Sequence, residues 1–439
     1  MTHRLTVIGT GYLGATHAAA MAELGHQVLG LDVDAAKVER LAAGDLPFFE
    51  PGLPEMLRSG LASGRLRFST DPAEAAAFGD VHFLCVGTPQ RPSGYAADLT
   101  QVDAAVDALA GHLGGPATLV GKSTVPVGTA QRIATRLRAA APAGDSVEVA
   151  WNPEFLREGH AVHDSLEPDR LVFGVGSPEA EATLRSVYAG VIARGTPVVV
   201  ADLPTAELVK VAANSFLATK ISFINAMAEL CEATGADVAQ LSEALSYDSR
   251  IGGQFLRAGL GFGGGCLPKD IRAFMARAGE LGVDQALTFL REVDAINQRR
   301  RERMVDLARE ELGGSFDGRR VAVLGAAFKP GSDDVRDSPA LEVAAAIHEQ
   351  GGQVRVFDPQ AMPNAKERFP LLTYCPGVDE VCAGAAVVLH LTEWPQFGEL
   401  DPAVLAQVVA HRRVVDGRGA LDAARWRAAG WTYRALGRP

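Results

Sequence analysis

A single cysteine, Cys266, directly follows a run of glycines in the segment GLGFGGGCLPKDI, residues 259–271. Glycine puts no side chain in the way and allows positive φ, so a ligand can approach both the backbone N–H groups and the thiol. A nearby cation or helix N-terminus favours the thiolate, which is the reactive form of cysteine. The segment therefore indicates a nucleophilic cysteine. The alternative is a small residue in a flexible loop.

Two further polar residues, Lys210 and Asn214, lie four positions apart in the segment AELVKVAANSF. On a helix this spacing puts both side chains on one face, where they could bind a developing alkoxide or an attacking water. The alternative is a solvated lysine and a surface asparagine, but the neighbouring positions are largely apolar.

A dehydrogenase with a nucleophilic thiol has a specific use. Hydride transfer from an alcohol gives an aldehyde, which the thiol captures as a thiohemiacetal. A second hydride transfer gives a thioester, and hydrolysis releases an acid. One site then carries out a four-electron oxidation.

The cofactor motif is Gly9-x-Gly11-x-x-Gly14, which follows a short apolar strand and opens an alanine-rich helix. The first glycine makes the turn, the second lets the backbone approach a pyrophosphate, and the third packs helix on strand. Asp32 closes the next strand, where its carboxylate can accept from a ribose 2′-hydroxyl and would repel a 2′-phosphate. The motif predicts NAD rather than NADP. Asp34 could share the role of Asp32, and the alternative is a glycine turn without a ligand.

A second strand–glycine–helix–strand pattern begins near residue 320 and keeps only Gly325 of this fingerprint. Lys329 and Arg336 bring positive charge in place of the missing glycines. This pattern predicts a site for a different phosphorylated ligand, or for the far end of the same one. The alternative is a solvated loop.

The fold class predicted from these patterns is α/β, with two Rossmann-like parallel-sheet domains joined by a central helical domain. The stretch 205–230 has no Pro or Gly, which predicts one long helix. We expect domain boundaries at 1–202, 203–312 and 313–439.

The composition excludes several classes of protein. The chain has 439 residues and a net charge of −11, which argues against nucleic-acid or anionic-membrane binding. It has no signal-peptide pattern and no apolar stretch of about 18 residues, so no membrane span is expected. The five cysteines are scattered without a CxxC pair, which argues against a disulfide framework or a metal site and favours a cytoplasmic location.

Seven segments in order resemble the UDP-glucose/GDP-mannose dehydrogenase family along almost the whole chain: GTGYLG, CVGTP, STVPVGT, NPEFLREG, ELVKVAANSFLATKISFINAMAEL, RIGGQFLRAGLGFGGGCLPKD and FKPGSDDVRDSPA. The family oxidises the C6 hydroxyl of a nucleotide sugar and reduces two NAD per turnover. The resemblance implies oxidation of UDP-glucose to UDP-glucuronate through the cysteine chemistry above. It also implies that the first domain binds NAD, the central one forms a homodimer or higher homo-oligomer, and the last binds UDP.

The resemblance also implies individual roles. Cys266 would be the nucleophile, and Lys210 would stabilise oxyanions with Asn214 beside it. The remaining catalytic residues would handle the attacking water or transfer protons: Asp270, Thr124 and Glu154. Residues near the cofactor would be Gly9, Gly11, Tyr12, Leu13, Gly14, Asp32, Lys37, Gly87, Thr88, Pro89, Thr124, Glu158 and Arg336. Residues near the nucleotide sugar would be Glu154, Phe155, Leu156, Arg157, Lys210, Asn214, Arg250, Phe255, Leu256, Arg257, Gly259, Gly263, Phe328 and Lys329, with Arg250 reaching the sugar of a neighbouring subunit.

Three positions depart from the common family pattern. Gly265 stands where Ser is frequent, Leu267 where Phe is common, and Arg257 where many relatives have Lys. The first two lie beside the nucleophile, so they could alter the rate or the choice of sugar.

Several alternative functions remain open. GDP-mannose and UDP-N-acetylhexosamine 6-dehydrogenases share every catalytic motif. A two-electron hydroxyacid dehydrogenase of similar layout would need no cysteine. A non-catalytic NAD-binding protein would be expected to lack Cys266, Lys210 or Asp270, and all three are present.

Overall fold

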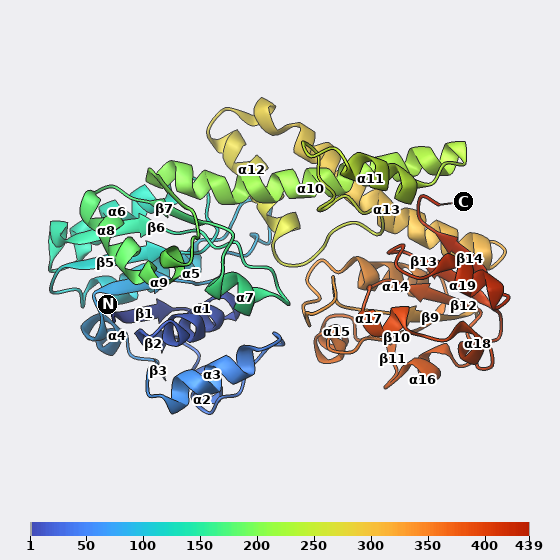
Figure 1. Ribbon diagram of the computed structural model, residues 1–439, viewed down its shortest axis with the longest axis horizontal. Helices are drawn as coiled ribbons and strands as arrows, with labels where there is room; N and C mark the ends of the chain where they lie inside the picture. The colour runs from blue at the N-terminus through green and yellow to red at the C-terminus, as the bar shows by residue number, and fades with distance from the viewer. Residues whose placement is uncertain (1, 439) are drawn as a thin grey trace. The chain divides into compact units, whose positions relative to one another are not determined.

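The computed structural model describes residues 2–438. They form two compact units (Figure 1). The first unit contains the chain up to Ala213 together with Arg272–Gly282, and the second contains Asn214–Ile271 together with the chain from Val283 onwards. Two helices, α10 (Leu203–Thr234) and α12 (Leu267–Glu280), contribute residues to both units.

The first unit is built on an eight-stranded sheet with the order β3-β2-β1-β4-β5-β6-β7-β8. The strands are β1 (Arg4–Ile8), β2 (Gln27–Leu31), β3 (Leu66–Ser69), β4 (Val81–Leu84), β5 (Ala117–Gly121), β6 (Val147–Trp151), β7 (Leu171–Gly174) and β8 (Val198–Ala201). The helices are α1 (Tyr12–Glu23), α2 (Ala35–Ala42), α3 (Leu53–Ala62), α4 (Pro72–Phe78), α5 (Thr100–Ala110), α6 (Thr129–Ala140), α7 (Ala161–Leu166), α8 (Pro178–Val187) and α9 (Ala189–Ala193), with a 3-10 turn at Gly144–Ser146. Buried side chains of α1, α3 and α8 form one hydrophobic core, and those of α5 and α6 form another.

The second unit is built on a six-stranded sheet with the order β11-β10-β9-β12-β13-β14. Its strands are β9 (Arg320–Leu324), β10 (Gln353–Phe357), β11 (Thr373–Tyr374), β12 (Val387–His390), β13 (Arg413–Asp416) and β14 (Thr432–Ala435). Its helices are α11 (Val238–Ser246), α13 (Phe289–Glu311), α14 (Pro339–Glu349), α15 (Met362–Arg368), α16 (Val378–Cys382), α17 (Pro395–Gly398), α18 (Pro402–Leu405) and α19 (Ala423–Ala428), with a 3-10 turn at Asp284–Leu287.

The prediction of two Rossmann-like sheets is confirmed. The first six strands of the first sheet and all six of the second follow the same order, and these neighbours pair in parallel. In such sheets the strand order reverses at one point, here between β1 and β4 and between β9 and β12. Ligands bind outside the carboxyl ends of the strands at that point.

One part of the first sheet differs from the prediction, because it is not wholly parallel. β7 pairs antiparallel with β6 through Trp151 and Gly174, and β8 is parallel to β7. The connection between β6 and β7 therefore begins and ends at the same edge of the sheet. It contains the short helix α7 and makes no crossover along a face.

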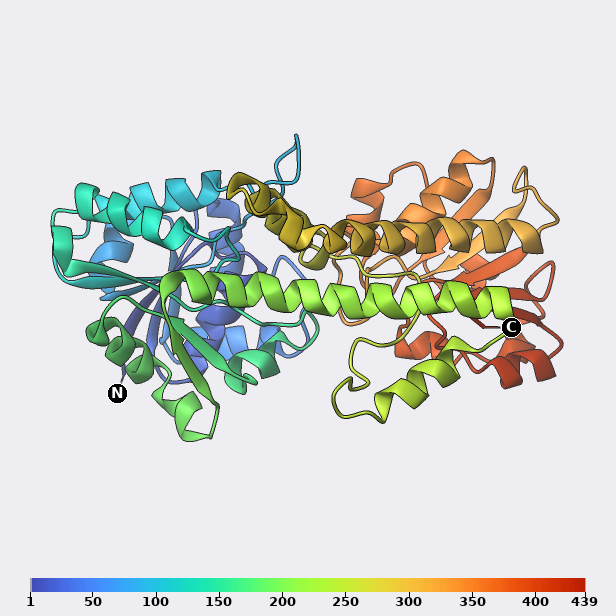
Figure 2. The ribbon, with the colours of Figure 1, turned by 90° about the horizontal axis from the view of Figure 1, so that it is seen from above.

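The long central helix is confirmed as α10, which Figure 2 shows as one uninterrupted helix. No helix within residues 2–438 combines the length and apolar character that crossing a membrane requires. The predicted domain boundaries fall in the connections from β8 to α10 and from α13 to β9. The division into three domains stays a prediction.

Candidate functional site

The first glycine turn joins the buried strand β1 to α1 and is built for close approach. A Cβ at Gly14 would lie 1.8 Å from the Gly9 carbonyl oxygen, so only glycine allows this packing of helix on strand. A Cβ at Gly11 would meet nothing within 4 Å, which leaves open space at the N-cap of α1. No side chain caps the helix there. The exposed N–H groups and the open space fit a pyrophosphate. Tyr12 and Leu13 open the helix.

Asp32 lies just after β2 and is held by the same turn. Its Oδ2 accepts from Thr10 N at 2.8 Å and from Lys37 Nζ at 3.0 Å, and its Oδ1 accepts from Asp34 N at 3.1 Å. Burial opposes ionisation of the carboxyl, but the backbone bonds from Asp34 and Thr10 and the Lys37 ammonium outweigh it and lower the pKa of Asp32. Asp32 is therefore ionised where a ribose would lie. Asp34 caps α2 instead, by accepting from Lys37 N.

Asp32→Ala is expected to reduce the preference for NAD over NADP by about tenfold or more, since hydrogen bonds to a charged group are worth about 1.5–3 kcal/mol. The variant loses the acceptor for the 2′-hydroxyl and leaves Lys37 available to a 2′-phosphate. Calorimetric Kd values for both dinucleotides measure the ratio. Asp34→Ala is the matched control: it removes a helix cap and should leave the ratio unchanged. An unchanged ratio in Asp32→Ala would mean that another residue reads the ribose.

Glu50 is a residue of this region that the sequence analysis missed. Its side chain is 1% exposed and accepts from the Tyr12 hydroxyl, from Gly159 N at 2.6 Å and from Ala161 N at 2.8 Å. Burial and the neighbouring Glu50 carboxylate raise the pKa of Tyr12. Glu50 thus ties the glycine turn to the end of the segment NPEFLREG, which includes Glu158. No motif around Glu50 signals this role, because its partners are far away in sequence.

The loops after β4 and β5 also meet. Gly87, Thr88 and Pro89 follow β4, and the buried Thr88 donates through Oγ1 to the carbonyl oxygen of Thr124 at 2.8 Å. These predicted cofactor and water-binding residues therefore lie at the carboxyl edge of the sheet, beside the point where the strand order reverses.

The loop after β6 brings together three residues predicted to act on the substrate. Lys210 Nζ lies 3.0 Å from Glu154 Oε1, with side chains only 6% and 13% exposed. The ammonium also lies 5.5 Å from the centre of the Phe155 ring. Glu154 Oε2 accepts from Leu156 N at 2.6 Å, which fixes the carboxylate. A buried carboxylate paired with a buried ammonium can transfer or stabilise charge during a reaction.

Arg157, in the same segment, is committed to a protein partner. Its Nε donates to Asp164 Oδ2 at 2.9 Å, and its backbone N donates to the same oxygen at 2.9 Å. The hydrogen bond to Asp164 raises the pKa of Arg157. The guanidinium therefore anchors the loop to α7, and only its exposed face remains for a ligand.

In the second unit, Cys266 is exposed and immediately precedes α12. Its carbonyl oxygen accepts from Asp270 N at 2.9 Å. The Asp270 carboxylate is 2% exposed, with one oxygen accepting from Asn214 Nδ2 and the other from Lys269 Nζ, both at 2.6 Å. The structure therefore brings together Asn214 and Asp270, and it places the thiol at a helix N-terminus that favours the thiolate.

The other four cysteines are buried, as expected for Cys85 and Cys231. Burial raises the pKa of Cys85 and that of Cys382 to about 12, so these thiols stay protonated at neutral pH. Cys266 differs from all of them in its exposure.

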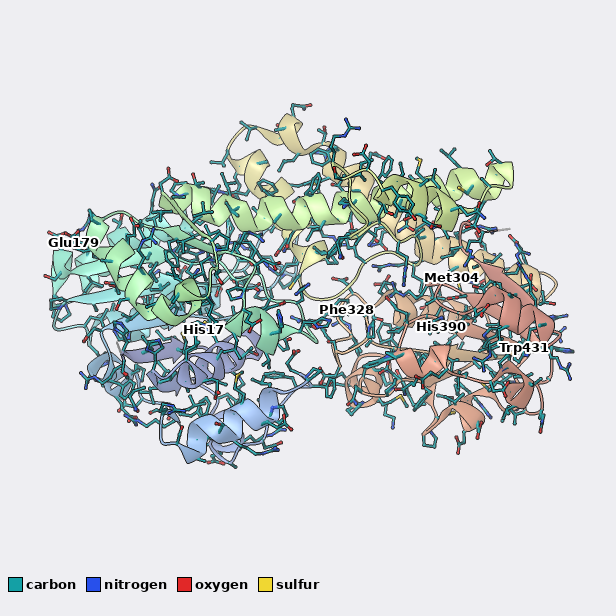
Figure 3. The ribbon with its side chains drawn as sticks, viewed as in Figure 1. His17, Glu179, Met304, Phe328, His390 and Trp431 are labelled. Carbon is teal, nitrogen blue, oxygen red and sulfur yellow. The ribbon has the colours of Figure 1, made fainter. Side chains whose placement is uncertain are left out.

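The glycines before Cys266 pack against other parts of the second unit. Gly261 has φ +88°, and a Cβ there would lie 2.1 Å from Asn297 Oδ1. A Cβ at Gly264 would lie 2.8 Å from the ring of Phe328. Figure 3 labels Phe328. Equally close approaches occur to Gly417 at Gly259, to Asp337 at Gly263 and to Arg336 at Gly265. The glycines therefore let the loop pack tightly against the protein.

Two residues missed by the sequence analysis hold this loop in place. Asn297 accepts from Phe262 N at 2.8 Å and donates to Phe262 O at 2.9 Å. Arg418 donates to the carbonyl oxygens of Gly261 at 3.0 Å and of Phe328 at 2.9 Å. Both side chains lie more than thirty positions from the loop along the chain, so no local pattern could reveal them.

The other predicted substrate residues of the second unit are more dispersed. Arg250 is exposed and paired with Asp248, Arg257 is exposed, and Phe255 has φ +60°. Leu256 is 2% exposed in a hydrophobic cluster, so only its backbone remains for a ligand. Lys329 lies beside the ring of its neighbour Phe328. Arg336, which was predicted to contact NAD, pairs with Asp334.

Family models match three stretches of the chain. Residues 3–192 match the NAD binding domain of the UDP-glucose/GDP-mannose dehydrogenase family, residues 204–299 its central domain, and residues 322–423 its UDP binding domain. The chain belongs to the UDP-glucose/GDP-mannose dehydrogenase family.

Members of this family resemble the chain along its whole length. UDP-glucose 6-dehydrogenase TuaD of Bacillus subtilis is 38% identical, with 99% of this chain and 93% of the relative covered. The UDP-glucose 6-dehydrogenase of Rhizobium meliloti is 39% identical, with 99% and 100% covered. The structure of a UDP-glucose dehydrogenase from Pyrobaculum islandicum superposes with a TM-score of 0.92 at 40% identity, covering 100% of this chain and 98% of that one.

Proposed function

We propose that this dehydrogenase oxidises the C6 alcohol of UDP-glucose to the carboxylate of UDP-glucuronate, with NAD as oxidant. The observation that carries the proposal is Cys266: exposed, at the N-terminus of α12, and followed by a buried Asp270 that Asn214 and Lys269 hold. An alcohol dehydrogenase that stops at the aldehyde needs no such thiol. Full-length relatives named UDP-glucose 6-dehydrogenase support the choice of sugar.

NAD is the cofactor of this family and of this chain. The open space at Gly11 and the uncapped N-terminus of α1 fit its pyrophosphate, and the ionised Asp32 fits its adenosine ribose. Further contacts are assigned to the loop Gly87–Pro89 and to Glu158 and Arg336. When bound, NAD accepts the hydride in each oxidation.

The chain's own residues carry the remaining chemistry in this proposal. The Cys266 thiolate adds to the C6 aldehyde, and the oxygen that becomes negative is stabilised by Lys210. Glu154 takes up and returns protons. After the second oxidation a thioester joins C6 to sulfur. Asp270, with Thr124 and Asn214, handles the water that hydrolyses this bond, which releases the acid and restores the thiol.

The number of NADH molecules formed per sugar tests both the chemistry and the substrate. UDP-glucose is supplied in limiting amount with excess NAD, and GDP-mannose and UDP-N-acetylhexosamines are run alongside. About two NADH from UDP-glucose alone are expected. Two from another sugar would keep the mechanism and change the substrate, and one from every sugar would remove the thioester step.

We also propose that two copies associate through α10. Phe216, Phe223 and Leu230 are 67%, 49% and 57% exposed and recur every seven residues, so they form an apolar stripe on one helix face. The contact between the two copies would be formed by the proposed central domain, 203–312. Light scattering should give the mass of a dimer or a multiple of it, and a monomer would refute the association.

The proposed location is the cytoplasm. The scattered cysteines and the exposed Cys266, which must stay reduced to act, support it. Fractionation of the source cells tests the location, and recovery in a secreted fraction would refute it.

A further inference from the structure

We propose that Lys122 is a positioning residue for Glu154: it holds the start of the loop that carries this carboxylate and places a buried positive charge close to it. The inference deepens the proposed function and rests on it, because Glu154 is assigned there as the group that moves protons. No role for Lys122 follows from the sequence, where it appears only as the residue before STVPVGT.

The first argument comes from the contacts of the Lys122 side chain. Lys122 follows β5 directly and is 7% exposed. Its ammonium donates to Asn152 Oδ1 at 2.9 Å, and the Asn152 carbonyl and the Tyr188 hydroxyl each lie at 3.4 Å. Asn152 in turn donates through Nδ2 to Val172 O at 2.9 Å. Lys122 therefore fixes the residue at which the chain leaves β6, two positions before Glu154.

The partners of Lys122 are unusual for a buried ammonium, because each accepting atom belongs to a neutral group. The ring of Tyr188, with its centre 5.9 Å from Nζ, is neutral as well. A buried charge normally lies beside an opposite charge, since its desolvation is otherwise costly. The Asn152 side chain does not need a buried charge to hold it, because the Tyr188 hydroxyl already donates to Asn152 Oδ1 at 2.7 Å. The fold alone therefore does not explain why a lysine is buried here.

The second argument is a cavity of about 50 Å³ that Lys122 and Glu154 line together. Its wall also includes His17 of α1, which is labelled in Figure 3. The Nε2 atom of this ring is buried without a hydrogen-bond partner. Burial lowers the pKa of His17 well below its usual value, so this ring is neutral. Two cations line the cavity: Lys122, which is 7% exposed, and Arg170, whose guanidinium carbon lies 3.9 Å from the centre of the Phe155 ring.

Other charged and titratable groups surround Lys122 and Glu154. Lys122 interacts favourably with Glu154 and unfavourably with Lys210, and Glu154 pairs with Lys210 on its other side. The other ionisable groups near Lys122 are Cys85, which is protonated, Tyr188 and His17, and those lining the rest of the cavity are Asp164, Asp169 and Arg170. Both Lys122 and Lys210 thus act on Glu154, and only Lys210 is assigned to the reaction.

Burial lowers the pKa of Lys122 to about 8. The effect of burial is larger than that of the interactions with Cys85 and Glu154, which raise this pKa. Lys122 is therefore charged throughout the acidic side of the pH range. There its charge attracts the Glu154 carboxylate, the group assigned to take up protons, so the pH dependence of turnover is where loss of this charge should be felt.

The test is the dependence of kcat on pH, measured between pH 5 and 7.5 by NADH formation from UDP-glucose. Lys122→Met removes the charge. The pH at which kcat falls on the acidic side of the profile, here called the acidic limb, should then rise by roughly one pH unit, the shift typical of losing an opposite charge nearby. Lys122→Arg keeps the charge and should retain the wild-type limb. Lys122→Gln is also neutral and still offers a donor to Asn152, so it should move the limb as Lys122→Met does, and it serves if Lys122→Met does not fold.

Tyr188→Phe is the matched control. It removes the other donor to Asn152 Oδ1 and leaves the charge, so kcat should fall while the acidic limb stays in place. A limb that stays at the wild-type pH in both neutral variants would overturn the proposal and reduce Lys122 to a packing residue. Failure of the proposed function is distinguishable, because the wild-type protein would then not form about two NADH per UDP-glucose.

Discussion

Cys266→Ala is expected to abolish formation of the acid and to lower overall turnover by about a thousandfold or more, as removal of a nucleophile typically does. Without the thiol no thiohemiacetal forms at C6, so the second hydride has no covalent intermediate to leave from. The variant should release at most about one NADH per UDP-glucose in a single turnover. Spectrophotometry of NADH together with chromatography of the sugar measures both numbers.

The control for Cys266→Ala is Cys231→Ala, which changes a buried thiol of α10 that is 5% exposed. It should cost some stability and leave the stoichiometry at about two. Alkylation gives an independent check, since iodoacetamide should modify the exposed Cys266 first and inactivate the wild-type protein in step. Formation of about two NADH by Cys266→Ala would rule out the thioester route.

Lys210→Ala is the second large effect, expected to lower kcat by about a thousandfold with little change in the Kd for NAD. The ammonium is 3.0 Å from Glu154 Oε1. The variant removes the charge that stabilises oxyanionic species, and it leaves a buried carboxylate without its partner. Breaking a buried pair in this way typically costs about 3–5 kcal/mol of stability.

Stability and chemistry can be separated with a double variant. Lys210→Met with Glu154→Gln removes both charges of the pair, so much of the lost stability should return. Turnover should not return, because neither charged group is present. Thermal unfolding and steady-state kinetics on the three variants give the comparison. Turnover of Lys210→Ala close to that of the wild type would remove Lys210 from the mechanism.

Much of the fold could be predicted because its signals are local. The first glycine turn, Asp32 at the end of β2 and the uninterrupted run that forms α10 each depend on residues within one or two elements. The second sheet was also predictable, since its strands are short apolar runs separated by helical segments.

The remaining features depend on pairing and packing between distant segments. All four residues of β7, LVFG, are apolar and buried, so their sequence does not indicate whether the strand pairs with β6 in a parallel or an antiparallel direction. Gly261 and Gly264 are explained by Asn297 and Phe328, which lie on other elements. Glu50 binds donors more than a hundred positions away as well as Tyr12.

The reversal at β7 sets where α10 can begin. β7 meets β6 where Trp151 pairs with Gly174, the last residue of each strand, so β7 and the parallel β8 end beside the carboxyl end of β6, and α10 starts just beyond β8 at Leu203. Near the start of this helix, Glu207 accepts from Gly128 N and from Ala130 N at the beginning of α6, both at 2.7 Å. At about 1.5 Å per residue, the step from Leu203 to Lys210 covers about 10 Å, and the lysine side chain spans the rest to Glu154.

The number of residues in the first turns of α10 therefore fixes where the Lys210 ammonium lies relative to the sheet. Inserting one residue between Leu203 and Lys210 would rotate the lysine by about 100° around the helix and carry it away from its carboxylate. A chimera that exchanges cofactor domains between relatives should accordingly be joined beyond Lys210, at the Ala213 limit of the first unit. A joint at the start of the helix would keep every residue of the site but could change the distance and rotation between Lys210 and Glu154.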